Sequence, residues 1–329
     1  MSRLTATTRI FVAGHRGMVG AALVRRLRAH GCANLLLRTR AELDLADQDA
    51  VHEFMQREQP EVVFLAAAKV GGVHANDTLR ADFIYQNLQI EINVIHAAFA
   101  AGVTRLLFLG SSCVYPRSCP QPIKEEYLLT GPLEPTNEPY AVAKIAGIKM
   151  CESYNRQYGT QYISAMPTNL YGPGDNYDVS GSHVLPALIR KTHEAKMRGD
   201  PAVTVWGTGT PRREFLYSDD MAEGCVHLMS LDPLPNNEAT GYPIFNLGCG
   251  VDLTIRELAE LVKKVVGFEG ELDFDTGKPD GMSKKLLEVS RMKALGWQAT
   301  TSLEQGISIA YHDFIRRFPA VSLSNPVFA

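Results

Sequence analysis

The sequence predicts an α/β fold, a doubly wound parallel sheet followed by a smaller C-terminal α/β region. Two observations predict it. Short apolar runs alternate with segments of helical periodicity as far as residue 166, which is typical of parallel strand–helix–strand units. Beyond that residue the alternation gives way to loops rich in glycine and proline. We therefore expect a first domain over residues 1–170, to which later segments return, and a mostly separate second domain over residues 171–329.

The individual elements follow from the spacing of apolar residues. Runs such as EVVFLAAA have the length of buried strands, whereas isoleucine, leucine and phenylalanine recur at helical spacing through residues 81–101. Three polar residues interrupt that helix, Asn87, Glu91 and Asn93, and we expect them to be exposed or at a subunit interface. The expected strands span residues 9–13, 34–37, 61–68, 105–109 and 162–166, and the expected helices span residues 21–31, 48–58, 81–101, 140–158, 185–196 and 254–266.

Composition excludes several classes of protein. The 329 residues are 45% hydrophobic, enough for a large core, and the net charge of -3 gives no reason to expect a nucleic-acid or membrane partner. No apolar run approaches the roughly 20 residues that cross a bilayer. The six cysteines form no C-x-x-C pair, which argues against a disulfide framework and a zinc site. We expect a cytoplasmic protein that contains no metal.

A glycine-rich turn joins the first strand to the first helix. It reads Gly14, His15, Arg16, Gly17, Met18, Val19, Gly20. Glycines permit a tight turn and a close approach of a pyrophosphate, and the helix N-terminus offers N–H groups to it. The spacing G-x-x-G-x-x-G departs from the commoner G-x-G-x-x-G, and alone it is often only a turn. Its place between strand and helix favours a Rossmann-type dinucleotide site.

Basic residues near this turn favour NADP over NAD. The second strand ends in Arg38 and Arg40, where an NAD site usually has an acidic residue, and Arg16 lies in the glycine turn. Arginine suits a 2′-phosphate. The alternative is that both strand-end arginines are ordinary solvated residues.

A serine, a tyrosine and a lysine form a candidate catalytic set. Tyr140 and Lys144, four residues apart, lie on one face of a helix, and Ser111 leaves a strand end earlier in the chain. If both helical residues face a cofactor, we expect the lysine to lower the tyrosine pKa and to make it a proton donor and acceptor near neutral pH. Alone, this spacing is a weak signal, because both residue types are often exposed.

Longer motifs carry a specific resemblance. The segments AGHRGMVG, LAAAKVGG, LGSSCVYP, EPTNEPYAVAKIAGIKMCESYNRQYG, MPTNLYGP and WGTGTPRREF resemble the extended short-chain dehydrogenase/reductase superfamily and, within it, the GDP-L-fucose synthase family. The resemblance covers about residues 9–314. It implies an NADP-dependent enzyme that epimerises carbons 3 and 5 of GDP-4-keto-6-deoxy-D-mannose and reduces carbon 4 to give GDP-L-fucose. It also implies a homodimer packed through the helices at residues 81–101 and 140–158.

The resemblance assigns site residues by position. It implies catalytic roles for Ser111, Cys113, Tyr140, Lys144 and His183. It implies cofactor contacts from Gly14, His15, Arg16, Gly17, Met18, Val19, Gly20, Arg40, Leu109, Gly110, Ser111, Ser112, Lys144, Pro167, Thr168, Asn169, Leu170 and His183. It implies substrate contacts from Lys191, Trp206, Arg213, Asp280 and Lys285, with Asp280 either contacting the sugar or ordering its loop.

Epimerisation needs a base and an acid besides the reducing group. The resemblance implies that Cys113 is the base and His183 the acid, with Tyr140 and Ser111 stabilising the enolate oxygen. A lone cysteine after a strand is more often a small buried hydrophobe, and a lone loop histidine is usually structural. A nucleotide-sugar 4,6-dehydratase, a 4-epimerase and an NADP-sensing regulatory protein are the alternatives. Ser112, Cys113 and Val114 stand where a dehydratase has an acidic pair, which disfavours dehydration.

Overall fold

A computed structural model describes residues 4–178, 181–236, 241–278 and 280–319. Its centre is a six-stranded sheet in the order β2-β1-β3-β4-β5-β9, and every neighbouring pair is parallel. The strands are β1 (Ile10–Ala13), β2 (Leu35–Leu36), β3 (Val62–Leu65), β4 (Arg105–Leu109), β5 (Gln161–Pro167) and β9 (Ile244–Leu247). After β1 the chain adds β2 on one side of β1 and then adds β3, β4, β5 and β9 on the other side. The strand order therefore reverses between β1 and β3. Ligands bind at such a reversal, outside the carboxyl ends of the strands.

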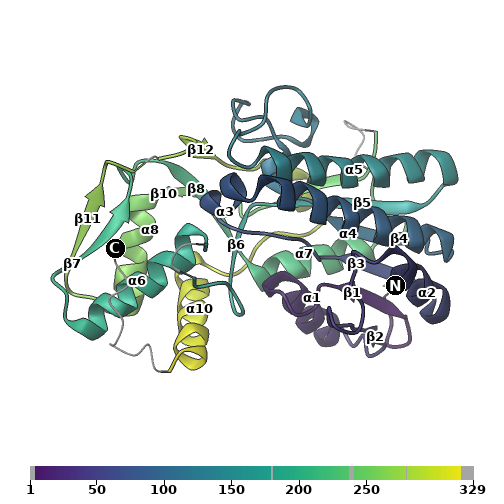
Figure 1. Ribbon diagram of the computed structural model, residues 1–329, viewed down its shortest axis with the longest axis horizontal. Helices are drawn as coiled ribbons and strands as arrows, with labels where there is room; N and C mark the ends of the chain where they lie inside the picture. Colours follow the sequence, from purple (N-terminus) through teal and green to yellow (C-terminus); the bar gives the residue numbers. More distant parts are fainter. Residues whose placement is uncertain (1–3, 179–180, 237–240, 279, 320–329) are drawn as a thin grey trace.

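Helices cover both faces of this sheet, which confirms the α/β prediction (Figure 1). The helices are α1 (Met18–Ala29), α2 (Gln48–Glu58), α3 (Val73–Thr78), α4 (Arg80–Ala100), α5 (Glu138–Tyr158), α6 (Val184–Arg198), α7 (Ser218–Ser230), α8 (Ile255–Val266), α9 (Ser290–Ala294) and α10 (Leu303–Arg317). On one face α2, α4 and α5 form a cluster with alternate strand residues, and on the other face α1 and α7 pack against the remaining ones. This follows from the side-chain period of two along a strand.

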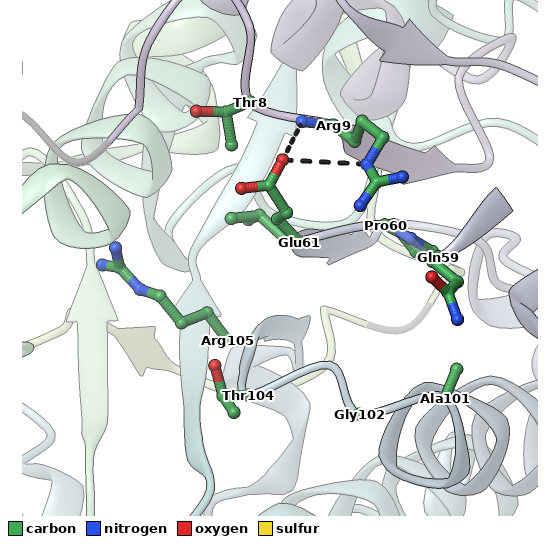
Figure 2. A pocket seen from close by; sticks show the side chains of 10 residues that line it. Thr8, Arg9, Gln59, Pro60, Glu61, Ala101, Gly102, Thr104 and Arg105 are labelled. Atoms are coloured by element: carbon green, nitrogen blue, oxygen red, sulfur yellow. Dashed lines mark hydrogen bonds and ion pairs between the residues drawn. The ribbon is translucent and has the colours of Figure 1, made fainter.

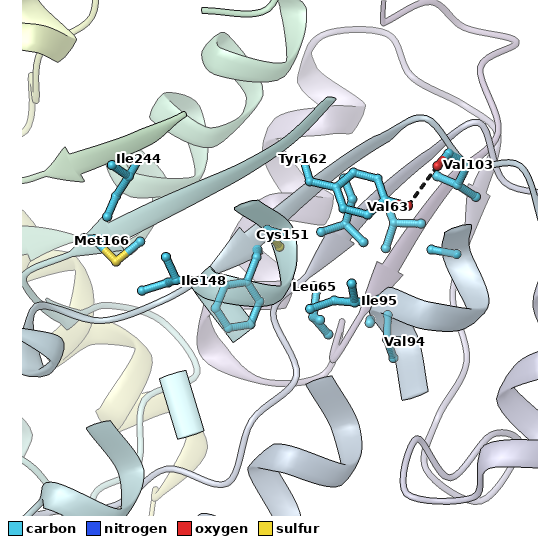
Figure 3. Packing of buried hydrophobic residues seen from close by; sticks show 14 of the residues in the cluster. Val63, Leu65, Val94, Ile95, Val103, Ile148, Cys151, Tyr162, Met166 and Ile244 are labelled. Atoms are coloured by element: carbon cyan, nitrogen blue, oxygen red, sulfur yellow. Dashed lines mark hydrogen bonds between the residues drawn. The ribbon is translucent and has the colours of Figure 1, made fainter. Parts of the chain in front are cut away.

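The core on the α4 and α5 face contains mostly aliphatic side chains (Figure 3). Val63 and Leu65 of β3 point into it together with Val94 and Ile95 of α4. One of its polar groups is bonded within the core: the Tyr162 hydroxyl donates a hydrogen bond of 2.9 Å to the Val103 carbonyl. The residues that leave the carboxyl ends of these strands therefore follow directly on a packed apolar layer.

The interior of this layer also holds the three polar residues of α4, and here the sequence prediction was wrong. Asn87, Glu91 and Asn93 are 0%, 1% and 9% exposed. The Asn87 side chain bonds both backbone groups of Lys69, and Asn93 donates to the Leu45 carbonyl at 3.0 Å. These contacts lie on other segments of the chain, so the helical pattern of α4 gives no sign of them.

The second region stands at one end of the molecule (Figure 1). It contains β6 (Asn169–Tyr171), β8 (Arg212–Tyr217), β10 (Asp252–Thr254) and β12 (Lys284–Lys285) in one sheet, and β7 (Ala202–Trp206) with β11 (Glu271–Asp275) in another. Its core joins α6, α8 and α10. A capping box in which Thr254 and Glu257 bond each other's backbone N–H fixes the start of α8. The sequence prediction included α6 and α8 but not α7 or α10.

No helix in the described ranges is both long enough and apolar enough to cross a membrane. The six cysteines all lie within those ranges, and none of them is in a disulfide. In the same part of the chain no group of three or more histidine, cysteine, aspartate or glutamate side chains is arranged to hold a metal ion.

Candidate active site

The predicted catalytic residues meet beyond the carboxyl ends of β4 and β5. Ser111 follows β4 and precedes a short 3₁₀ turn, Ser112–Val114, and its hydroxyl accepts a hydrogen bond of 3.2 Å from the Cys113 backbone N–H. The same hydroxyl acts on the phenol of Tyr140, on the first turn of α5, and favours a lower pKa there. Strand end, turn and helix thus bring three of the predicted side chains to one place.

Tyr140 lies in a poorly solvated position, and its pKa is raised rather than lowered. Burial is the largest cause of the raised pKa, electrostatic interactions with Cys113 and Glu91 act in the same direction, and the Ser111 hydroxyl opposes them. Lys144 is not among the groups that shift this pKa, so its expected lowering of the Tyr140 pKa when both residues face a cofactor stays a prediction. Tyr140 is therefore protonated at neutral pH, which suits a proton donor.

Lys144 lies beneath Tyr140 in the protein interior. Its side chain is 2% exposed, and its Nζ is 3.0 Å from Oε1 of Glu91. The ammonium also lies over two aromatic rings, 4.7 Å from the Phe108 centroid and 5.9 Å from the Tyr140 centroid. Glu91 was missed as a site residue, since the sequence gives no means of pairing α4 with α5.

Lys285 contacts Cys113, and its charge also acts on His183. Lys285 is 9% exposed, and its ammonium donates a hydrogen bond of 3.5 Å to Cys113 Sγ. His183 is accessible to solvent but crowded by protein, and this desolvation lowers its pKa, with a smaller effect of Lys285 in the same direction. A small hollow beside Cys113 and Lys285 is also lined by Ser112, Asn137 and Met282, among others.

A backbone contact holds the segment that carries His183. The Gly72 N–H donates to the Gly181 carbonyl at 3.0 Å, and a Cβ at Gly72 would lie 2.8 Å from the Ser182 carbonyl oxygen. His183 itself is the N-cap of α6. The glycines after β3 therefore let a distant loop pack closely against the carboxyl edge of the sheet.

The glycine turn has the geometry that a dinucleotide pyrophosphate requires. Gly14 has a φ of +85°, and a Cβ there would lie 2.8 Å from the Ala67 backbone. A Cβ at Gly20 would overlap the Gly14 carbonyl, so the third glycine permits α1 to begin against the turn. These two positions leave the α1 N-terminus open to a phosphate.

Other predicted cofactor residues surround the same edge of the sheet. Leu109 and Gly110 end β4, while Pro167, Thr168, Asn169 and Leu170 follow from the end of β5 into β6. The Thr168 and Asn169 side chains both donate to the Glu214 carbonyl, at 3.3 and 2.8 Å, which fixes this bend of the chain.

The arginines after β2 differ in their exposure to solvent and in how closely an acidic partner pairs with them. Arg38 is paired with Glu58 at 3.0 Å and lies over the Phe54 ring. The Arg40 side chain is 82% exposed, and its ion pair with Asp44 is 3.4 Å long. Arg16 is exposed in the glycine turn. Arg40 and Arg16 are thus available to a phosphate, whereas Arg38 has its charge balanced.

The predicted substrate residues lie in the second region. Trp206 is 58% exposed, and two ammonium groups lie over it, Lys191 at 4.9 Å and Lys278 at 5.3 Å. Lys278 was not predicted, because a lysine in a turn has no distinguishing pattern. Burial lowers the pKa of both Lys191 and Arg213, and the Asp280 carboxylate opposes this effect at Arg213.

Two members of that set have partners within the protein. Asp280 accepts hydrogen bonds of 2.8 Å from both the backbone N–H and the hydroxyl of Thr208, so it orders the loop that follows Trp206. Lys285 is opposite Arg213 in the β12–β8 pairing, yet its ammonium contacts Cys113. The structure thus places Lys285 between the candidate base and the basic residues of the second region.

A larger hollow of about 420 Å³ opens at the opposite edge of the sheet (Figure 2). Thr8, Arg9, Glu61 and Thr104 line it, before the starts of β1, β3 and β4. Arg9 and Glu61 pair with each other there. None of the predicted catalytic residues lines this hollow, so its size does not make it the active site.

Comparisons with known proteins agree with this geometry. Residues 10–248 match the NAD dependent epimerase/dehydratase family. The chain is 57% identical to GDP-L-fucose synthase of Escherichia coli (strain K12), over 93% of this chain and 96% of that protein, and 56% identical to GDP-L-fucose synthase 1 of Arabidopsis thaliana, over 94% of each. A structure of MlghC, a GDP-mannoheptose C4 reductase from Campylobacter jejuni with NADP bound, is similar with a TM-score of 0.85 and 42% identity, over 94% of this chain and 98% of that one. The chain therefore belongs to the NAD dependent epimerase/dehydratase family and, within it, to the GDP-L-fucose synthase family.

Proposed function

We propose that this chain is an NADP-dependent GDP-L-fucose synthase. It epimerises carbons 3 and 5 of GDP-4-keto-6-deoxy-D-mannose and then reduces carbon 4 to form GDP-L-fucose. The observation that carries the proposal is the meeting of two groups of residues at one edge of the sheet, Ser111 with Tyr140 and Lys144, and Cys113 with Lys285. Membership of the family and its GDP-L-fucose synthase relatives support the choice of substrate.

The epimerisation uses the group that contains Cys113, together with His183. The carbonyl at carbon 4 acidifies the protons at carbons 3 and 5, so Cys113 removes a proton from one face and His183 returns one to the other. The lowered pKa of His183 makes its imidazolium a stronger acid than an ordinary histidine. The enolate oxygen accepts hydrogen bonds from Tyr140 and Ser111, which stabilise its negative charge.

The reduction uses the same oxygen site. NADPH supplies the hydride for carbon 4 when it is bound. Tyr140 then transfers its proton to the oxygen, which becomes the hydroxyl of the product. Lys144 lies under Tyr140 and holds the nicotinamide ribose. The glycine turn, with no side chain at Gly14 or Gly20, receives the pyrophosphate.

The division of labour between the two regions follows the fold. We propose that residues 1–170 bind the cofactor together with β9 and α7, which return to the first sheet. Residues 171–329 supply most of the substrate contacts. We assign Lys191, Trp206 and Lys278 to the nucleotide, which the two ammonium groups over the indole ring support, and Arg213 to the diphosphate.

The experiment that tests the function follows NADPH absorbance and product deuterium together. The purified protein is incubated with GDP-4-keto-6-deoxy-D-mannose and NADPH in deuterated water. Stoichiometric NADPH oxidation with deuterium at carbons 3 and 5 is the expected result. Oxidation without deuterium would establish a second candidate, a simple C4 reductase, which the similarity to the Campylobacter jejuni reductase favours.

Arg40 is expected to select NADPH over NADH. Replacing it with serine removes an exposed guanidinium, whose charge-assisted bonds to a 2′-phosphate are worth about 1.5–3 kcal/mol, and so raises KM for NADPH at least about tenfold. KM for NADH should stay the same. Arg57→Ser is the matched control, since Arg57 is also exposed but follows no cofactor strand. An equal change of both KM values for Arg40→Ser would remove Arg40 from the site.

The chain is proposed to form a homodimer through α4 and α5, which lie side by side (Figure 1). Their outer surface exposes Tyr85 and Ile92, two turns apart on α4, and Tyr158 on α5, at 62%, 47% and 51%. Ile92→Asp places a charge on this surface and should give monomers in size-exclusion chromatography with light scattering. Met197→Asp, at an exposed position of α6, should keep the molar mass of the wild-type oligomer. A monomeric wild-type protein would refute the proposal.

A further inference from the structure

Glu91 and Lys144 form an ion pair in the interior of the first domain. Their side chains are 1% and 2% exposed, and the ammonium and carboxylate are 3.0 Å apart. Removing two charges from water costs several kcal/mol per ion, and well-packed apolar residues often stabilise such a position as well or better. Stability alone is thus a weak reason for a carboxylate here, directly behind a candidate catalytic lysine.

The surroundings are shaped around this carboxylate. Within the described residues neither Glu91 oxygen has a hydrogen bond of normal geometry, and the carboxylate is in an ion pair with the Lys144 ammonium. On α5 the position facing it is Gly147, where a Cβ would lie 2.9 Å from Glu91 Oε2 and would also overlap the Phe108 ring. The absence of a side chain at Gly147 gives the carboxylate its space.

The titratable groups that face Glu91 come from α5. They are Lys144, Tyr140 and Cys151. Burial raises the pKa of Glu91, and Lys144 opposes this rise. The Glu91 charge in turn adds to the raised pKa of Tyr140, so it favours the protonated phenol. An ammonium without this counter-charge would instead favour the phenolate, which cannot donate a proton.

We propose that Glu91 is a positioning residue of the active site, whose buried carboxylate fixes the Lys144 ammonium beneath Tyr140 and balances its charge, so that Tyr140 meets the substrate oxygen as a proton donor. The role in catalysis rests on the proposed function. Glu91 touches neither substrate nor cofactor and acts through Lys144 and Tyr140.

Glu91→Gln keeps the shape of the side chain and removes its charge. Without the carboxylate, the Lys144 ammonium is displaced or has no counter-charge. We expect this to lower kcat for NADPH oxidation about 10- to 100-fold and to leave KM for the GDP-sugar unchanged. The direction of the pH effect follows from Tyr140. Because Glu91 raises the pKa of Tyr140 and the reaction needs the protonated phenol, Glu91→Gln moves the alkaline limb of the kcat profile to lower pH. Glu91→Asp retains the charge and should recover part of the rate.

Glu125→Gln is the matched control. Glu125 is also 1% exposed and pairs with an arginine, Arg291, but that pair lies away from Lys144 and Tyr140. This variant should lose thermal stability without moving the alkaline limb. If Glu91→Gln loses stability in the same way and keeps the wild-type kcat and pH profile, Glu91 is only structural and the proposal is overturned.

A second measurement needs neither substrate nor turnover. Tyrosine labelled with ¹³C at Cζ reports the ionisation of each phenol by NMR, and the Tyr140 signal is the one missing from Tyr140→Phe. In Glu91→Gln this signal should titrate at lower pH than in the wild type. If Glu91→Gln does not fold, the same titration is measured on Glu91→Asp, where we expect the pH of the Tyr140 titration to shift less and in the same direction. An unchanged titration overturns the proposal even if the protein turned out to be inactive on the GDP-sugar.

Discussion

Tyr140→Phe is expected to lower both deuterium uptake at carbons 3 and 5 and NADPH oxidation, by about 10²- to 10⁴-fold. One hydroxyl serves both reactions, because negative charge develops on the same substrate oxygen in the enolate and in the reduction. Phenylalanine keeps the ring that packs edge-on against Phe83 but removes the hydroxyl and its proton. Rapid-quench mass spectrometry for deuterium and absorbance for NADPH measure the two rates.

Tyr162→Phe separates this effect from the general loss of a buried hydroxyl. Tyr162 is also buried, its hydroxyl bonds the Val103 carbonyl, and burial raises its pKa as it does for Tyr140. The control should lose about 1 kcal/mol of stability and keep both rates. If Tyr140→Phe lost only the reduction, the enolate would be stabilised elsewhere, and Ser111 would be the first candidate.

The fold was predictable wherever one local pattern determines one element. β4 and α2 have the bounds that their apolar spacing predicted, and the glycine turn begins α1 as expected. Strand, turn and helix are neighbours in the chain here, so the local sequence contains most of the interactions that determine these elements. α7 was missed because its small and polar residues, including Gly224 against the Trp297 ring, fit surfaces supplied by distant segments.

The candidate active site likewise has a part that the sequence predicted and a part that it could not predict. Ser111, Tyr140 and Lys144 were found by motif, and the structure brings them together. Their electrostatics were not predictable, because Lys144 forms an ion pair with Glu91, which lies on another helix. A glutamate in the middle of an apolar helix, interpreted as exposed, was the available signal. It becomes informative only when α4 is known to be covered by α5.

Lys285 is a similar case. Its sequence position indicated only a cation for the diphosphate, and that role stays a prediction. Its contact with Cys113 depends on the parallel pairing of β12 with β8 and on the turn after β4, three segments far apart in the chain. No spacing within any one of them contains that information.

Cys113→Ser is expected to abolish deuterium uptake at carbon 3 and to leave reduction of an already epimerised substrate far less affected. A serine hydroxyl has nearly the same shape, but it is a much weaker acid than a thiol, so it does not supply the anion that removes the proton. Tyr140, Lys144 and the cofactor edge are unchanged in this variant. Loss of carbon 3 exchange should therefore be at least about 10²-fold, the lower end of a general base's contribution.

The two steps are measured separately for this reason. Exchange is followed by mass spectrometry in deuterated water, and reduction is followed as NADPH oxidation with epimerised 4-keto sugar supplied from the wild-type enzyme. Cys119→Ser is the matched control: Cys119 is half-buried like Cys113 and also feels the Lys285 charge, but it belongs to neither group of site residues. Equal loss of both steps in Cys113→Ser would mean that the thiol supports the site as a whole. In that case the base lies elsewhere, and the Lys285 contact with sulfur is only a packing contact.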